Sequence, residues 1–289
     1  MTEFSFKSLT ENVGSEVMGL DMRQPLDDSA RDRLERELAD RSVLLVRGQT
    51  ELTPKQHIAF SRCFGPLEDH VLQNFCLPGH PEIFVVSNIV ENGKHIGAYG
   101  GSKEYHSDLA YLPEPSMGSV FHCLECPEEG GETAIVSMSA VYKALSAQRR
   151  GWLSQKRAVF DYVWQYERAH RDRPALTDEQ KERVPPIGHP AVRTHPVNGK
   201  PALFLSEIWV RRFEGLDDEE SQVMIRDILD FATSPEFTYV HKWRPGDVII
   251  WDNRNSMHKA CPFDEANTRR RMHRTTIKGS VPFFQAKAA

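Results

Sequence analysis

Two stretches far apart in the sequence carry side chains of the kinds that bind metal ions. In EYHSDLAY, residues 104–111, one residue separates His106 from Asp108. DVIIWDNRNSMHKA supplies a further histidine, His258. If residues 104–111 form a strand, the imidazole and the carboxylate at positions i and i+2 point to the same face. Two histidines and one carboxylate on one face of a metal ion leave adjacent coordination positions open, which is typical of non-haem Fe(II) sites that react with O2.

A run of arginines follows the second stretch. In RRRMHRTT, residues 269–276, strand alternation places Arg270 and Arg274 on one face. Three arginines in isolation are typical of an exposed strand, but their position just after His258 favours a site. Two cations that face a protein interior are costly unless they meet anions, and a guanidinium binds a carboxylate or sulfonate bidentately. A dicarboxylate cosubstrate could meet one arginine and an anionic substrate the other.

Composition limits the classes of protein that need to be considered. The 289 residues are 39% hydrophobic and 27% charged, as in ordinary soluble globular proteins. A net charge of -5 argues against nucleic acid as the main partner. No run approaches the roughly 18 apolar residues of a membrane helix, and the N-terminus shows no secretory pattern. We therefore expect a cytoplasmic protein without a membrane partner. Five cysteines, an odd number, do not indicate a disulfide framework.

The metal-binding residue types need a scaffold, and the sequence predicts a mainly β one. Many short apolar runs are separated by turn signals, and a few amphipathic stretches lie between them. This balance favours an α+β protein, an antiparallel barrel or sandwich with flanking helices packed on one side. The later strands are expected at 42–49, 83–88, 202–210, 237–243, 247–253 and 270–279, and the helices at 27–41, 53–65, within 137–156, and at 217–233.

Two long segments could cover the site. Residues 89–104 contain glycine and lysine and lead directly into His106. Residues 168–186 are highly charged and contain three prolines, so they cannot build a core alone. Because long loops inside a compact domain are often functional, both segments are predicted lids of a single domain that covers residues 1–289.

Four motifs in order along the chain resemble one enzyme family. YHSD, GGET, WDNRNSMH and RRMHRTTI are similar to segments of the taurine dioxygenase and dichlorophenoxyacetate dioxygenase family. VLLVRGQ, HIAFSRCFGPLE and VRTHPVNGKPALFLSE extend the resemblance over nearly the whole chain. It implies a double-stranded β-helix, or jelly-roll, barrel that uses Fe(II), 2-oxoglutarate and O2. The implied reaction oxidises, typically by hydroxylation, a small anionic organic substrate and yields succinate and CO2. The resemblance also implies a homo-oligomer, a dimer or a tetramer.

Position by position, the resemblance assigns roles to residues of this chain. His106, Asp108 and His258 match the iron ligands. Thr133, the last residue of GGET, and Arg270 match the pair that holds the far carboxylate of 2-oxoglutarate.

The substrate contacts implied by the resemblance are more scattered. Arg274 and His70 match contacts to the substrate anion, and Leu109 is expected in the pocket wall. The aromatic segment YVWQYERAH departs from the taurine enzyme, which favours a bulkier or more apolar substrate. Trp164 and Trp209 are then predicted wall residues, although structural packing explains either tryptophan equally well.

Three other functions share parts of the pattern. A halogenase on the same scaffold replaces the carboxylate ligand by a small residue, so Asp108 argues against it. A zinc-dependent hydrolase could use the same three ligands, but it leaves Arg270 and Thr133 without a purpose, and no H-E-x-x-H segment is present. A metal-binding sensor barrel without oxygenase activity would bind the metal without turning over 2-oxoglutarate.

Overall fold

The structure is a computed structural model that describes residues 3–70, 73–99, 101–169 and 174–286. Its largest element is an eight-stranded sheet, here called the major sheet, in which only β2 and β3 pair in parallel. In spatial order its strands are β1 (Ser5–Ser8), β2 (Ser15–Met18), β3 (Val43–Val46), β16 (Val248–Asp252), β8 (Gly118–Glu125), β18 (Arg271–Ile277), β5 (His80–Ser87) and β4 (Cys76–Leu77).

A second, smaller sheet faces the inner side of the major sheet. This minor sheet has the order β15 (Thr238–His241), β9 (Thr133–Ser137) and β17 (Ser256–Ala260). Between the two sheets lies a core that includes Phe121, Cys123, Ile135, Trp251 and Met272. β16 is buried on both faces, which explains why VIIW is continuously apolar rather than alternating.

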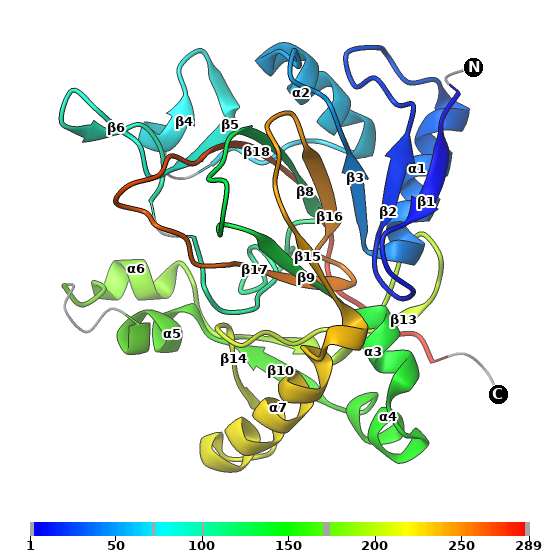
Figure 1. Ribbon diagram of the computed structural model, residues 1–289. Coiled ribbons are helices and arrows are strands. Elements are labelled where there is room, and N and C mark those ends of the chain that lie inside the picture. The colour runs from blue at the N-terminus through cyan, green and yellow to red at the C-terminus, as the bar shows by residue number, and fades with distance from the viewer. Residues whose placement is uncertain (1–2, 71–72, 100, 170–173, 287–289) are drawn as a thin grey trace.

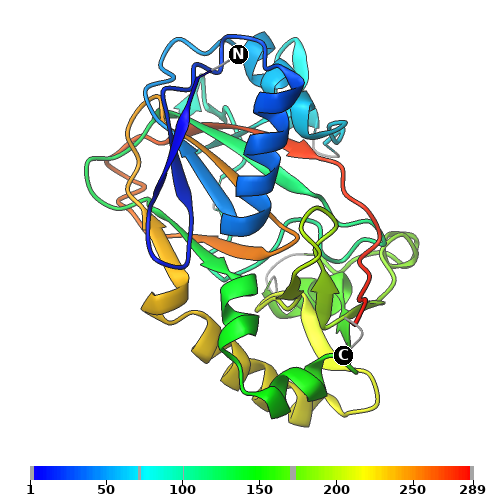
Figure 2. The same cartoon turned by 90° about the vertical axis from the view of Figure 1, so that its right-hand side faces the viewer.

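Two helices cover the outer face of the major sheet, and Figure 2 shows α1 lying across its strands. α1 (Asp28–Arg41) begins at Asp27, whose side chain accepts the Ala30 backbone N–H. α2 (Pro54–Ser61) begins with a capping box at Thr53 and runs into the 3-10 turn η1 (Arg62–Phe64). Both starts follow from residue types that the sequence displays.

The remaining helices gather below the strands in Figure 1 and surround a further core that includes two short sheets. The helices are α3 (Met138–Ala144), α4 (Ala147–Leu153), α5 (Tyr162–Ala169), α6 (Asp178–Glu182) and α7 (Asp218–Ala232). The short strands are β6 (Val90–Glu91), β7 (Lys94–His95), β10 (Arg157–Phe160), β11 (Ile187–Pro190), β12 (Val192–Thr194), β13 (Pro201–Leu203) and β14 (Val210–Phe213), and the other 3-10 turns are η2 (Gln73–Phe75) and η3 (Pro235–Phe237).

The mainly β prediction with flanking helices is confirmed, as is a helix within 137–156, but the continuous strand expected at 202–210 is wrong. Residues 104–111 form no strand, since only His106 makes an isolated bridge and a turn follows it. The stretch 137–156 contains two helices, because Ser146 starts a second one by accepting the Arg149 backbone N–H. The stretch 202–210 is interrupted by a turn between β13 and β14.

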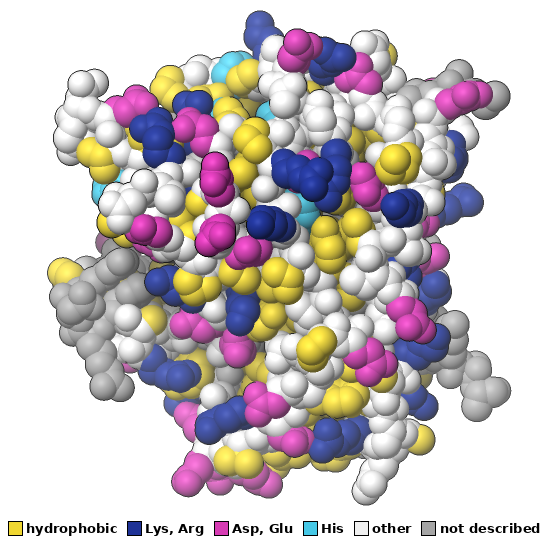
Figure 3. Space-filling model, in the orientation of Figure 1, with side chains coloured by type: hydrophobic (Ala, Val, Ile, Leu, Met, Phe, Trp, Pro, Cys, Tyr) yellow, Lys and Arg dark blue, Asp and Glu magenta, His cyan; other side chains and the backbone are white. Residues whose placement is uncertain are grey.

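The surface in Figure 3 mixes lysine and arginine with aspartate and glutamate over the face in view. None of the helices in the described part of the chain combines the length and apolar character that a membrane crossing requires.

Three buried histidines meet between α2 and the major sheet. His122 and His273 are cross-strand partners on β8 and β18, and the ring of His57 on α2 lies 6.0 Å from that of His122. Burial lowers the pKa of His57 to about 3, lowers that of His273 to about 4, and also lowers that of His122. The folded protein therefore holds all three imidazoles in the neutral form at neutral pH.

We expect the free energy of unfolding to fall as pH decreases from about 6.5 toward 4. In that interval these imidazoles bind protons in the unfolded chain but not in the folded one. Their contribution to the free energy of unfolding is therefore fully present above pH 6.5 and is lost progressively below it. Each proton that only the unfolded chain binds adds about 1.4 kcal/mol per pH unit to the slope of the free energy of unfolding against pH. Urea unfolding across this range should show a shallower slope for His57→Gln than for the unmutated protein. Parallel slopes would contradict the assignment to this cluster.

Candidate metal centre

His106 and His258 are held opposite each other by their own peptide groups. The N–H of His106 donates to the carbonyl of His258 at 3.0 Å, and the N–H of His258 donates back at 2.8 Å. β17, which carries His258, is itself paired with β9 of the minor sheet. The two ring centroids lie 4.5 Å apart. Backbone pairing between distant segments, rather than alternation along one strand, brings the two imidazoles together.

Asp108 completes the group from the turn that follows His106. Its Oδ1 lies 3.9 Å from Nε2 of His106, and its Oδ2 lies 3.8 Å from Nε2 of His258. The three ligand atoms lie within 4.8 Å of one another, and this is the one such group found in the described residues. The next residue, Leu109, has a φ of 55°, a left-handed conformation that is uncommon for leucine and that turns the chain sharply after the carboxylate.

The hydrogen bond of His106 leaves its Nε2 directed at the carboxylate, whereas the buried Nδ1 of His258 has no hydrogen-bond partner among the described residues. Nδ1 of His106 donates to the carbonyl of Glu104 at 3.0 Å, so Nε2 keeps its lone pair. Such a second bond fixes the tautomer and the ring orientation of a metal-binding histidine. The ring of His258 packs against Trp251 with centroids 4.4 Å apart.

Asp108 is held by donors from the β strands behind it. Its Oδ2 accepts from Nε1 of Trp251 at 3.1 Å, from Oγ of Ser119 at 3.3 Å and from Nδ2 of Asn253 at 3.4 Å. Its Oδ1 accepts from a guanidinium N–H of Arg274 at 3.2 Å. These hydrogen bonds therefore fix the orientation of the carboxylate without help from a metal ion.

The protonation states of the buried ligands suit a cation. Burial by itself raises the pKa of Asp108, but the charge of Arg274, together with the hydrogen bond from Trp251, outweighs it and holds that pKa well below its usual range. Burial lowers the pKa of His258 to about 3. An ionised carboxylate and a neutral imidazole are the forms that bind metal ions.

The turn between β16 and β17 is set by a buried charge network that sequence reasoning missed. Oδ2 of Asp252 lies 3.0 Å from Nε2 of His195 and 2.7 Å from Nη2 of Arg254, and Nε of Arg254 donates to Oδ1 of Asp252 at 2.8 Å. These bonds fix the start of the strand that carries His258. The sequence shows only a polar turn here, and nothing in it pairs that turn with a histidine 57 residues away.

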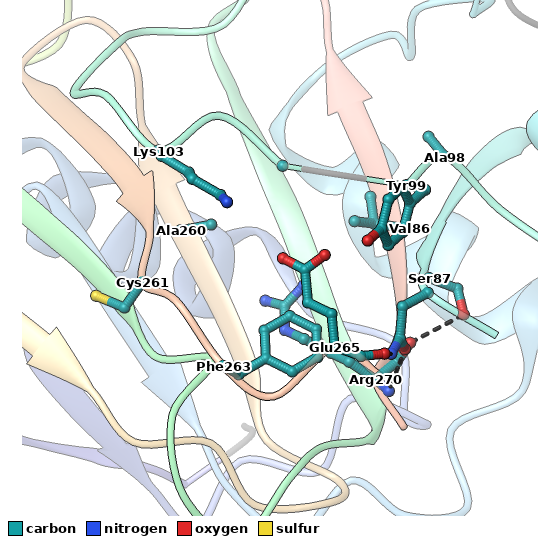
Figure 4. Close-up of a pocket in the computed structure, with 12 residues that line it drawn as sticks. Val86, Ser87, Ala98, Tyr99, Lys103, Ala260, Cys261, Phe263, Glu265 and Arg270 are labelled. Carbon is teal, nitrogen blue, oxygen red and sulfur yellow. Dashed lines mark hydrogen bonds between the residues drawn. The ribbon is translucent and has the colours of Figure 1, made fainter. Parts of the chain in front are cut away.

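Arg270 lies just before β18 with its side chain buried, and it lines a narrow cavity of about 30 Å³. Its guanidinium carbon lies 5.7 Å from the ring centre of Phe121. Among the described residues no carboxylate pairs with it, and its buried Nε has no hydrogen-bond partner. Burial lowers the pKa of Arg270, although the nearby thiols of Cys123, Cys126 and Cys261 act to raise it. Figure 4 shows Lys103 and Tyr99 extending toward this cavity from opposite sides.

The backbone of Arg270 is fixed from β5. Its N–H donates to Oδ1 of Asn88 at 2.8 Å, and Oγ of Ser87 donates to its carbonyl at 2.9 Å, the latter drawn in Figure 4. Thr133 lies in the same region, because its Oγ1 accepts from Nε1 of Trp243 at 3.1 Å and the Trp243 ring lies 5.5 Å from Phe121. Thr133 and Arg270 thus border one pair of aromatic rings, Trp243 and Phe121.

Arg274, His70 and Leu109 come together around a cavity of about 500 Å³, here called the anion chamber, which Asp108 also lines. The ring of His70 stacks on Phe84 at 3.7 Å, and the Arg274 guanidinium carbon lies 5.2 Å from the same ring. Burial, followed by the charge of Arg274, lowers the pKa of His70 to about 4. His70 is therefore a neutral hydrogen-bonding group beside a permanent cation.

The structure separates Trp209 from those three residues. It lies in the turn before β14, where its Nε1 donates to the carbonyl of Ser107 at 3.2 Å. It lines a second cavity of about 460 Å³, here called the outer chamber, which His106 also borders. Trp164 lines neither chamber and instead packs under Arg168, whose guanidinium carbon lies 4.1 Å from its ring.

Both predicted lid segments border these chambers but contain regular structure. Residues 89–104 include the β6–β7 hairpin, and 101–104 line the outer chamber. Residues 168–186 include α6, and four residues of this segment line the anion chamber, namely Leu176, Gln180, Arg183 and Val184. Residues 100 and 170–173 lie outside the described residues. The lid role of the two segments stays a prediction.

Comparison with known proteins gives consistent matches over almost the whole chain. Residues 5–276 match the taurine catabolism dioxygenase TauD, TfdA family. The α-ketoglutarate-dependent 2,4-dichlorophenoxyacetate dioxygenase of Cupriavidus pinatubonensis is 30% identical over 275 residues, covering 92% of this chain and 94% of that protein. The pentalenolactone F synthase of Streptomyces arenae is 29% identical over 269 residues, covering 89% of each. The crystal structure of AAD-2 in complex with Mn(II) and N-oxalylglycine superposes with a TM-score of 0.82 at 28% identity, covering 98% of this chain and 100% of that one.

Proposed function

Because the chain belongs to the taurine catabolism dioxygenase TauD, TfdA family and is therefore an α-ketoglutarate-dependent dioxygenase, we propose that it hydroxylates a small anionic organic substrate at an Fe(II) site. The proposed products from the cosubstrate are succinate and CO2. Among the relatives, one is a 2,4-dichlorophenoxyacetate dioxygenase and another is a sulfate ester dioxygenase, and both compounds are anions at neutral pH. An anionic substrate agrees with a cavity that has Arg274 in its wall.

The metal proposal rests on the donor set. His106, Asp108 and His258 offer two neutral imidazole nitrogens and one carboxylate oxygen that face one another, which suits Fe(II) and leaves room for further ligands. A similar chain was crystallised with Mn(II), a cation of comparable ligand preference. We assign these three residues as the ligands.

The observation that carries the cosubstrate proposal is the buried, anion-free guanidinium of Arg270 beside a cavity. A buried cation without a counter-charge is costly, and the cost is recovered when a carboxylate binds. We assign the far carboxylate of 2-oxoglutarate to Arg270, with the hydroxyl of Thr133 as a second donor. That hydroxyl accepts from Nε1 of Trp243 at 3.1 Å, and as a hydroxyl it can also donate its own hydrogen.

The chain's own contribution to the reaction is positioning. Fe(II), when bound with 2-oxoglutarate and O2, supplies the oxidising chemistry. Trp251 and Asn253 orient the Asp108 carboxylate, and the carbonyl of Glu104 orients the His106 ring. Arg274 and His70 would hold the substrate anion in the anion chamber, and Leu109 would form part of its apolar wall.

The alternatives explain fewer of these features. A zinc hydrolase or a sensor barrel could use the three ligands but would leave the buried Arg270 without a role, and a halogenase lacks the carboxylate that Asp108 provides. We further infer that the two facing sheets form the jelly-roll barrel expected of the family. A single domain and a cytoplasmic location stay predictions from the sequence, and a dimeric or tetrameric assembly stays a prediction that rests on the resemblance.

We expect O2 consumption to depend on both Fe(II) and 2-oxoglutarate and to be stimulated by one class of small anion, with succinate formed in equal amount. The test is an oxygen-electrode screen of sulfonates, sulfate esters, carboxylates, phosphonates and aryloxy acids, with succinate measured in parallel. Neutral analogues of the best substrate are the control, because they should stimulate far less if Arg274 binds the anion. Failure of 2-oxoglutarate to bind the anaerobic Fe(II) protein would refute the proposal.

A further inference from the structure

Two chambers approach the metal ligands from different sides. The anion chamber of about 500 Å³ reaches Asp108, and the outer chamber of about 460 Å³ reaches His106. Each is large enough for a drug-sized ligand. Tyr162, the first residue of α5, is the residue that lines both. It therefore stands in the boundary between them.

The boundary is built from three aromatic rings, here called the aromatic partition. The ring of Tyr162 lies 4.8 Å from Tyr111, which lines the anion chamber, and 5.8 Å from Trp209, which lines the outer chamber. Tyr111 and Trp209 in turn lie 4.8 Å apart. Ring pairs at these separations attract one another beyond simple burial. The three rings form a continuous wall rather than isolated side chains.

The partition is anchored at both ends. Asp161, directly before Tyr162, is buried, forms an ion pair with Arg211 at 3.1 Å and donates its N–H to the Trp209 carbonyl at 2.8 Å. Its Oδ1 also accepts the backbone N–H of Trp164, which fixes the start of α5. The Nε1 of Trp209 is held by the carbonyl of Ser107, between the ligands His106 and Asp108. The wall is therefore tied to the metal-binding segment itself.

We propose that the aromatic partition sets the maximum length of the substrate and that Tyr162 is the residue that determines it. The inference rests on the proposed function, because the substrate anion is taken to lie at Arg274. With the anion fixed there, the apolar part of the substrate lies against Leu109, Tyr111 and the α6 segment. A chain longer than the anion chamber meets the Tyr162 ring and cannot continue into the outer chamber.

The preferred substrates are then anions with a compact apolar body. Within the anion chamber each added methylene should improve affinity about fourfold, as burial of a CH₂ group predicts. Beyond the chamber further methylenes should add nothing or weaken binding. The plot of affinity against chain length should therefore show a break at the length that fills the chamber. Removing the Tyr162 side chain should join the two chambers and move this break to longer chains.

The experiment measures dissociation constants by calorimetry for linear alkanesulfonates and alkanoates of increasing length. The protein is loaded with Fe(II) and 2-oxoglutarate without O2, so binding is observed without turnover. Tyr162→Ala is compared with Tyr162→Phe, which keeps the ring, and with Tyr162→Leu, which keeps apolar packing if the alanine variant is poorly folded. Trp164→Ala is the matched control, because it truncates an aromatic residue of the same helix that lines neither chamber.

We expect the unmutated protein, Tyr162→Phe and Trp164→Ala to share one break in the plot of affinity against length. Tyr162→Ala, and to a smaller extent Tyr162→Leu, should bind chains two methylenes beyond the break roughly tenfold or more tightly than the unmutated protein does. Parallel length profiles in all variants, or a shift reproduced by Trp164→Ala, would overturn the proposal. If 2-oxoglutarate binds but neither anion series does, both this inference and the anionic-substrate proposal fail. If 2-oxoglutarate does not bind, the proposed function itself fails.

Discussion

The His258→Ala protein is expected to retain its fold and to lose 2-oxoglutarate-dependent O2 consumption down to the rate without enzyme. The imidazole supplies one of three proposed metal bonds, and alanine leaves only His106 and Asp108 facing each other. The backbone bonds that pair residues 106 and 258 do not involve the side chain, so β17 should stay in place. The measurement is iron content per chain after desalting, together with O2 uptake.

A matched control is His80→Ala, because His80 belongs neither to the metal-binding group nor to the two chambers. Asp108→Ala should behave as His258→Ala does for iron content, and it also frees Arg274 from its present partner. Retained turnover in either ligand variant, at an iron content equal to that of the control, would show that the metal lies elsewhere.

The second large effect is expected for Arg270→Ala, which should weaken 2-oxoglutarate binding by about 30-fold or more. Loss of one partner from a buried, hydrogen-bonded charge pair costs about 2 kcal/mol or more, and about 1.4 kcal/mol is tenfold in affinity. Binding of the substrate anion should change far less. Isothermal titration of the anaerobic Fe(II) protein measures both constants.

Three controls separate this role from a general disturbance. Arg274→Ala should show the reverse pattern, with weakened binding of the substrate anion. Arg270→Lys keeps the charge but loses the planar fork, so its affinity for 2-oxoglutarate should be intermediate. Thermal unfolding of the unliganded Arg270→Ala protein should not be lowered much, because the substitution removes a buried cation that has no anionic partner in the described residues. A reversed pair of affinities would exchange the roles of the two arginines.

The sequence predicted most of what depends on residue type and local period. Asp27 and Thr53 start α1 and α2 as their capping types indicate, and alternation places Arg274 on the inner side of β18, opposite Phe121. The grouping of His106, Asp108 and His258 could also be predicted, because few combinations of residues serve a metal with open positions. Their roles stay predictions until the variants above are measured.

Features that depend on contacts between distant segments could not be predicted from the sequence. Residues 104–111 contain tyrosine and leucine and look like a strand, yet the neighbouring strand pairs with His106 alone and Leu109 then turns the chain away. The bond between His195 and Asp252 joins segments that share no local pattern. The position of Trp209 within the aromatic partition, facing the outer chamber rather than Arg274, likewise follows from packing, which one sequence does not display.

The reciprocal backbone hydrogen bonds between His106 and His258 also bear on how the protein binds its metal. Because folding alone spaces the two imidazoles, the site should exist in the metal-free chain, and an ion should enter with little further loss of conformational entropy. The metal ion should then exchange with solution without unfolding the protein, and folding should not require it. For such a ready-made site, the order of affinities for divalent ions favours copper, nickel and zinc over iron. Activity in a mixed-metal solution should therefore follow the supply of ions, with zinc acting as a competitive inhibitor that leaves the fold unchanged.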